Sequence, residues 1–175
     1  MAEIDFITAL GRLLRDGNLR DAYAAQPDTV AARLDLRPED RPAFRQLVPE
    51  DVEFQARILL RKRFDLVRRF LPDTAGRLGE KAWPLFLEYA RVNWPAEPRV
   101  ALRDAFQFCQ RLREQQPSLV CQSEWNRLRF ALSERNFAIH GQLRAEGDGI
   151  ARPRVQIFYR DRSRRWREFS FSLRL

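Results

Sequence analysis

Two different spacings of hydrophobic residues divide the sequence near Asn136. Before that residue, apolar side chains recur every three or four positions, which predicts amphipathic helices; after it they alternate with polar ones, which predicts strands. The longest helical pattern runs from Val52 to Phe70 and should end before Pro72, because proline lacks an amide hydrogen. Its apolar stripe, which we expect to be buried, consists of Phe54, Ile58, Leu59, Phe64, Leu66, Val67 and Phe70. The opposite side is mostly basic, and its simplest interpretation is a solvated face of a core helix.

Shorter amphipathic segments flank this helix on both sides. Helices are predicted over residues 5–15, 19–25, 29–34, 38–47, 81–93, 100–115 and 124–134. Asn18, Asp28 and Ser123 occupy capping positions before three of them. Gly17 is expected to end the first helix, and residues 73–79 are expected to form a turn.

The alternating region predicts a small antiparallel meander of three strands. The apolar faces of the strands are Phe137, Ile139, Gly141 and Leu143; Val155, Ile157 and Tyr159; and Phe169, Phe171 and Leu173. In the first strand this pattern is typical of a half-buried strand, with His140 on the outward face. The predicted fold class is therefore α+β, with a helical domain over residues 1–135 and a meander over residues 136–175 packed on it.

Composition adds one informative feature, an uneven distribution of charge. The 175 residues fit one domain, and the formal net charge is +8. Of the 32 basic residues, 30 are arginines. This preference for arginine over lysine can reflect the base composition of the genome, so we give the overall charge little weight. Residues 150–175, however, contain eight arginines and only two acids, so most of the positive charge is concentrated on the last hairpin.

The sequence contains no recognisable reaction centre. His140 is the single histidine, and phosphate-binding, dinucleotide-binding and nucleophile-elbow motifs are missing from the chain. Cys109 and Cys121 lack metal-ligand spacing and are expected to be buried thiols. We therefore expect no catalysis, no metal and no cofactor in this chain. With neither a secretory signal nor a long apolar stretch, we expect a soluble, cytoplasmic protein.

The basic hairpin is the best candidate for a binding site. The candidate peptide-binding residues are Tyr159, Arg160, Arg162, Arg164, Arg165, Trp166 and Arg167. Arginines interleaved with aromatic residues can hold an acidic peptide or a nucleic acid, and the edge of a meander can accept an extended strand. The alternative is a solvated hairpin whose arginines discourage aggregation at the sheet edges.

One stretch carries a family resemblance. ILLRKRFDLVRRFLPDTAGRLGEKAWPLFLEYARVNWP (residues 58–95), followed by LRDAFQFCQRL (102–112), resembles the accessory proteins encoded beside DUF692-type multinuclear non-haem iron oxidative enzymes in clusters that make modified peptides. DFITALGRLLRDGNLRDAYAAQPDTVAARLDL, near the N-terminus, is also similar to that group. The resemblance is strongest to the TglI-type partner subunit of 3-thiaglutamate biosynthesis.

This resemblance implies a division of labour between two proteins. The chain would be a non-catalytic subunit in a heterodimer with a DUF692-type iron oxidase, and iron would be held by that partner. Its sheet would resemble a precursor-recognition element that binds the leader of a ribosomally made peptide and presents a C-terminal cysteine for excision of its β-carbon. Trp83, Trp94 and Pro95 are the candidate partner interface, although both tryptophans can equally be core residues. We expect neither a nucleic-acid nor a membrane partner; the alternative is a basic nucleic-acid-binding or regulatory module.

Overall fold

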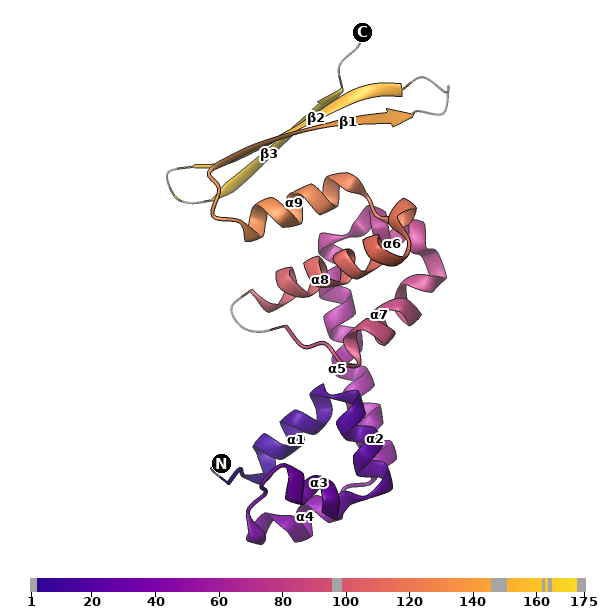
Figure 1. Ribbon diagram of the computed structural model, residues 1–175, viewed down its shortest axis with the longest axis vertical. Helices are drawn as coiled ribbons and strands as arrows, with labels where there is room; N and C mark the ends of the chain where they lie inside the picture. The colour runs from indigo at the N-terminus through magenta and orange to yellow at the C-terminus, as the bar shows by residue number, and fades with distance from the viewer. Residues whose placement is uncertain (1–2, 96–98, 146–150, 162, 164, 173–175) are drawn as a thin grey trace. The chain divides into compact units, whose positions relative to one another are not determined.

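The computed structural model describes residues 3–95, 99–145, 151–161, 163 and 165–172. The chain forms two compact units (Figure 1). The first contains the residues up to Arg69 together with Leu78–Asp104, and the second contains Phe70–Arg77 together with the residues from Ala105 onward. The prediction of helices followed by a three-stranded antiparallel sheet, an α+β arrangement, is confirmed.

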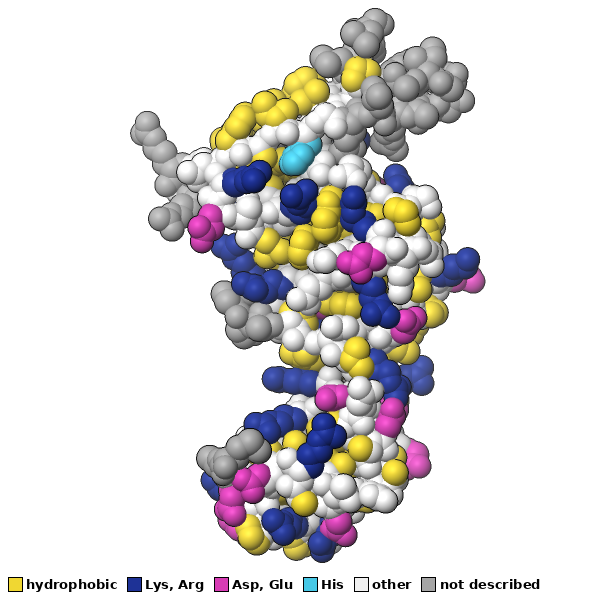
Figure 2. All heavy atoms as spheres, in the orientation of Figure 1, with side chains coloured by type: hydrophobic (Ala, Val, Ile, Leu, Met, Phe, Trp, Pro, Cys, Tyr) yellow, Lys and Arg dark blue, Asp and Glu magenta, His cyan; other side chains and the backbone are white. Residues whose placement is uncertain are grey.

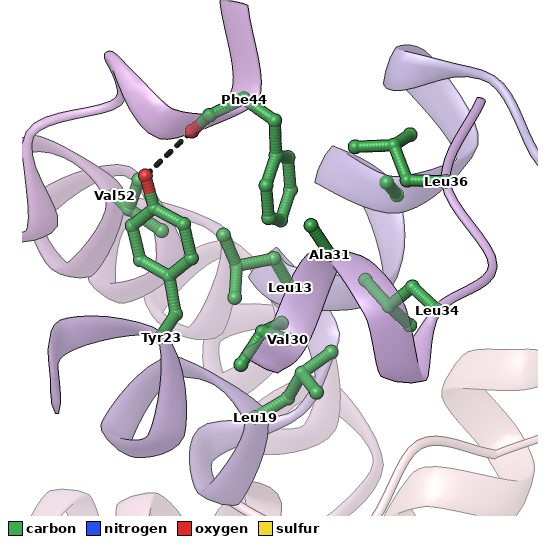
Figure 3. Close-up of a cluster of buried hydrophobic side chains, with 10 residues drawn as sticks. Leu13, Leu19, Tyr23, Val30, Ala31, Leu34, Leu36, Phe44 and Val52 are labelled. Atoms are coloured by element: carbon green, nitrogen blue, oxygen red, sulfur yellow. Dashed lines mark hydrogen bonds between the residues drawn. The ribbon is translucent and has the colours of Figure 1, made fainter. Parts of the chain in front are cut away.

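The first unit is helical. Its elements are α1 (Phe6–Arg15), α2 (Gly17–Ala25), α3 (Pro27–Arg33), η1 (Pro38–Asp40), α4 (Arg41–Arg45), α5 (Pro49–Phe70, as far as Arg69), η2 (Gly79–Lys81), α7 (Ala82–Ala90) and the first turn of α8 (Val100–Gln115). Helices α1 to α4 and the start of α5 share a core of leucine, valine and alanine side chains (Figure 3). In it the Tyr23 ring meets the Phe44 ring edge-on, with 5.0 Å between centroids, and the Tyr23 hydroxyl donates to the Phe44 carbonyl at 2.6 Å.

Two aspartates cap the first helices. Asp5 accepts from the Thr8 amide at 2.8 Å, and Asp16 accepts from the Asn18 and Leu19 amides, so the predicted cap at Asn18 is wrong by two residues. Gly17 does not simply end α1. Its amide donates to the Arg91 carbonyl at 2.8 Å, and a Cβ at this position would lie 2.2 Å from Arg91 Cγ, so only glycine fits there.

Helix α5 buries a stripe different from the predicted one. Phe64 and Val67 are buried as predicted, but Phe54 and Leu66 are exposed, at 61% and 43%. Arg63 is buried in their place and donates to both carboxylate oxygens of Asp104, at 2.9 and 2.8 Å. A buried guanidinium is stable here because it is paired with a carboxylate.

The second unit combines helices with the sheet. Its elements are α6 (Pro72–Leu78, as far as Arg77), the remainder of α8, η3 (Pro117–Leu119), α9 (Gln122–Leu132), β1 (Phe137–Ala145), β2 (Ala151–Arg160) and β3 (Trp166–Ser172). The turn predicted after Asp73 is instead helix α6. Its amides at Asp73 and Thr74 donate to the buried Glu124 carboxylate at 2.6 and 2.9 Å, which caps the helix from a distant position.

The sheet has the order β1-β2-β3 and is antiparallel throughout. Ile139 lies opposite Ile157, which lies opposite Phe169, and this register shows which of the described side chains share a face. Helix α9 runs along one face, as Figure 1 shows. Strands β1 and β3 are the two edges.

Candidate binding site on the C-terminal sheet

The apolar face of the sheet is turned toward solvent. Phe137, Ile139, Phe169 and Phe171 are 56%, 57%, 55% and 46% exposed, respectively. The register places the half-buried side chains of Val155, Ile157 and Tyr159 between them. Figure 2 shows hydrophobic side chains in a row along the sheet. We refer to these seven residues as the apolar face.

The opposite face, which packs on α9, carries mostly polar side chains together with Phe158. Phe158 and Gln156 are fully buried there, and the Phe158 ring stacks on Phe130 of α9 with 5.2 Å between centroids. His140 also lies on this side, with its ring edge-on to Phe158 at 5.9 Å. The prediction that His140 faces outward is therefore wrong, because α9 covers the face that carries it.

A hydrogen-bonded network compensates for the cost of burying polar groups under the sheet. The Asn126 side-chain amide donates to Gln156 Oε1 at 3.1 Å, and Gln156 Nε2 donates to Glu168 Oε1 at 3.0 Å. Arg127 donates to both oxygens of Glu168, at 2.7 and 3.3 Å. Each buried polar group thus has a partner, so burying this face carries little desolvation penalty.

The predicted peptide-binding residues have different environments. Tyr159 belongs to the apolar face and stacks on Phe169, with 5.8 Å between centroids. Arg165, Trp166 and Arg167 are exposed, whereas Arg162 and Arg164 lie outside the described residues. Arg160 donates to the carbonyl oxygens of Phe130, Ala131, Ser133 and Arg135, at 3.2, 3.4, 2.6 and 3.0 Å. Its guanidinium therefore stabilises the end of α9.

Asp161 organises the hairpin between β2 and β3. Its Oδ1 accepts from the Ser163 amide at 2.9 Å, the Ser163 hydroxyl at 2.6 Å and the Arg165 amide at 3.0 Å. These hydrogen bonds, led by that from Ser163, lower the pKa of Asp161. The carboxylate fixes the turn that precedes the exposed Arg165 and Arg167.

The candidate interface residues lie in an aromatic cluster of the first unit. Trp83 is half-buried beside Phe64, at 5.5 Å between centroids, and the Arg61 guanidinium lies 5.1 Å from its ring. Trp94 is half-buried under Arg63, 4.4 Å from its ring, and Pro95 is buried. These contacts give both tryptophans a structural role, and their contact with a partner stays a prediction.

A basic pocket in the second unit was not predicted from the sequence. It has a volume of about 280 Å³ and lies between α8, α9 and β1. Arg129, Arg135 and His140 line it, together with Phe106, Phe130 and neighbouring residues. Arginine is so frequent in this chain that neither Arg129 nor Arg135 stood out. Burial, together with the charges of Arg129 and Arg135, lowers the pKa of His140.

Other candidate chemistry is limited in the part of the chain that the structure describes. No group of three or more His, Cys, Asp or Glu side chains there is placed to hold a metal ion. Cys109 and Cys121 are free and buried, as predicted, and burial raises the pKa of Cys109 to about 12. None of the described helices is both long and apolar enough to cross a membrane.

A known protein family is similar to the middle of the chain. Residues 39–114 match the family model described as SCO6045-like, C-terminal domain. The matched segment runs from η1 into α8, covers less than half of the chain and leaves out the sheet. No curated protein and no solved structure matches the chain. The chain is thus similar to this family over its middle segment, and the family description names no activity or ligand.

Proposed function

We propose that this protein is a non-catalytic partner subunit of an iron-dependent, DUF692-type oxidative enzyme. It binds the leader of a ribosomally made precursor peptide and presents the peptide's C-terminal cysteine to that enzyme, as in 3-thiaglutamate biosynthesis. The single observation that carries the proposal is the sheet, which exposes Phe137, Ile139, Phe169 and Phe171 on one face while Gln156 and Phe158 are buried under α9 on the other. The resemblance of residues 58–112 to DUF692 accessory proteins is the reason for proposing that enzyme as the partner.

The apolar face is suited to docking a second protein. Contiguous exposed apolar side chains on a soluble domain mark interaction surfaces, and aromatic residues dominate the centres of such interfaces. Four of the seven side chains of the apolar face are aromatic: Phe137, Tyr159, Phe169 and Phe171. Full burial of a phenylalanine side chain contributes about 1.5–3 kcal/mol, so covering this face would supply substantial binding energy. We assign this surface to the oxidase.

The edge of β3 is suited to an extended peptide. As an edge strand, it has backbone groups available to pair with an added strand, and side-chain contacts then provide specificity. Arg165, directly before β3, and Arg167, its second residue, are both exposed, and their charges favour an acidic leader. In this arrangement the chain binds and orients the peptide, and the oxygen-dependent chemistry belongs to the partner.

Co-purification with a DUF692-type oxidase tests the docking surface. The double variant Ile139→Glu/Phe169→Glu should keep its thermal stability, because both side chains are exposed, and should lose the complex. Ile7→Glu/Phe54→Glu is the matched control, since those side chains are 72% and 61% exposed in the other unit. A complex that survives the first variant, or is lost equally in the second, contradicts the assignment.

Fluorescence anisotropy of a labelled acidic leader peptide tests the β3 edge separately. Arg165→Glu/Arg167→Glu should weaken leader binding at least tenfold, because it replaces attraction by repulsion. Arg57→Glu/Arg69→Glu makes the same change in net charge on exposed positions of α5 and should leave leader binding within about twofold. Unchanged leader affinity in the first variant would remove the hairpin from the proposal while leaving the docking surface untouched.

A second candidate function is nucleic-acid binding, which the exposed Arg165, Trp166 and Arg167 favour. Affinity for a random duplex would then fall linearly with salt concentration on logarithmic axes. Sequence preference that survives physiological salt would support this function over the first. Binding erased by salt would indicate only the attraction expected of a chain with net charge +8.

A further inference from the structure

The basic pocket between α8, α9 and β1 has a chemistry that peptide binding on the sheet does not use. Its basic groups come from different parts of the fold: Arg129 from α9, Arg135 from the connection after α9, and His140 from β1. None of its described lining residues is acidic. Neither the Arg129 nor the Arg135 guanidinium forms an ion pair with a described residue, so both can act as donors to a ligand. Figure 2 shows the histidine in cyan with basic side chains nearby.

The end of α9 would ordinarily weaken an anion site at this place. Unpaired carbonyl groups at a helix C-terminus carry a partial negative charge and would repel a carboxylate. Here Arg160 donates to the carbonyl oxygens of Phe130, Ala131 and Ser133 and so neutralises them. The potential in the pocket is therefore set by Arg129 and Arg135, and the lowered pKa of His140 reflects both of these charges as well as burial.

Apart from Ser133, the remaining walls are apolar. Phe106 of α8, Phe130 and Leu132 of α9 and Ala138 of β1 provide them. A hydrated inorganic ion gains nothing from such walls, whereas an organic anion buries its carbon atoms against them. The volume of about 280 Å³ lies just below the range typical of drug-sized ligands, roughly 300–1,000 Å³, so the ligand is small.

We propose that this pocket binds a carboxylate carried on a compact apolar group, with Arg129 and Arg135 holding the carboxylate and the Phe106 and Phe130 rings contacting the apolar part. The carboxylate belongs either to a free organic acid or to the C-terminus of a peptide. This proposal is independent of the oxidase partner, because every lining residue lies in the second unit of this chain and away from the apolar face.

The single histidine makes a direct test possible by nuclear magnetic resonance, because one imidazole signal reports on the pocket. Added 3-phenylpropionate should shift that signal saturably and raise the pKa of His140, since a bound anion stabilises the imidazolium. The neutral analogue 3-phenylpropanamide should do neither. A response to the amide equal to that of the acid, or a shift that never saturates, overturns the proposal.

Matched variants separate a built site from general electrostatics. Arg129→Gln/Arg135→Gln should weaken 3-phenylpropionate binding at least tenfold, whereas Arg57→Gln/Arg69→Gln, with the same change in net charge, should leave it within about twofold. Equal weakening by both, or tighter binding of inorganic phosphate than of 3-phenylpropionate, overturns the proposal. A capped tripeptide with a free C-terminal phenylalanine distinguishes the sources: tighter binding than 3-phenylpropionate indicates a chain terminus, and weaker binding indicates a free acid.

Discussion

Gln156 of β2 donates to Glu168 of β3 at 3.0 Å, beneath the sheet and next to α9. Gln156 is fully buried, so its side of β2 is the covered face of the sheet. Because successive side chains alternate between faces, Val155 and Ile157 must then lie on the other, exposed side. The hydrogen bond between Gln156 and Glu168 therefore marks the side of the sheet that α9 covers. The sheet has the opposite of the usual orientation, because its apolar residues face solvent.

Removing one partner of the buried ion pair in the first unit should strongly destabilise the protein. Asp104→Ala leaves the Arg63 guanidinium buried without its carboxylate, and we expect a loss of about 3–5 kcal/mol in the free energy of unfolding. Asp65→Ala is the control, because Asp65 pairs with Arg61 at 4.0 Å on an exposed face and should cost less than about 1 kcal/mol. Urea unfolding measures both, and equal losses would contradict the buried pairing.

Helix α6 should depend on a residue that lies far away in the sequence. Glu124→Ala removes the acceptor of the Asp73 and Thr74 amides and of the Thr74 hydroxyl, which should cost about 1–3 kcal/mol. Amide hydrogen exchange over residues 72–78 should become faster than in the exposed control Glu134→Ala. Exchange that is equally slow in both variants would mean that Glu124 is not the cap of α6.

The Cys109 thiol should be unreactive in the folded protein. Burial keeps it in the neutral form, and at pH 8, well below its pKa of about 12, almost no thiolate is present. Iodoacetamide at pH 8 should alkylate Cys109 in urea but not in buffer, as read by mass spectrometry of the peptides. Alkylation at the same rate in both conditions would contradict the burial of this residue.

His140 should make stability depend on pH in a defined direction. Its pKa is lower in the folded than in the unfolded chain, so the folded state binds fewer protons, and stability is lost as pH falls below about 6.5. Arg129 and Arg135 are the charged groups facing it, and neighbouring Phe106, Gln156 and Phe158 are neutral. Between pH 7 and about 5, the free energy of unfolding should fall less for His140→Gln than for the natural chain. An equal loss would assign the dependence to other groups.

The helices could be predicted from the sequence where their signals are local. The period of residues 100–115 gave α8 with its observed bounds, because apolar spacing and the following Pro117 are both local features. Helix α6 was missed because its cap, Glu124, is distant in sequence. Gly17 was interpreted as a helix end, whereas its role is a close contact with Arg91, which only the tertiary structure provides.

The strands of the sheet could be predicted, but their orientation could not. Alternation of apolar and polar residues gives the two faces of each strand, and burial of the apolar face is the ordinary expectation. In this protein α9 presents Asn126, Arg127 and Phe130 to the sheet, and these side chains pair with Gln156, Glu168 and Phe158. Such complementarity between elements has no periodic signal. The binding pocket was missed for the same reason, since its basic residues converge only in the fold.

The orientation of the sheet is the central claim, and paired alanine substitutions test it most directly. Phe158→Ala should lower the free energy of unfolding by about 3–5 kcal/mol, because its ring is fully buried against Phe130. Phe137→Ala should lower it by less than about 1 kcal/mol, because that side chain is 56% exposed on the apolar face. A large loss for Phe137→Ala with little change for Phe158→Ala would contradict the account.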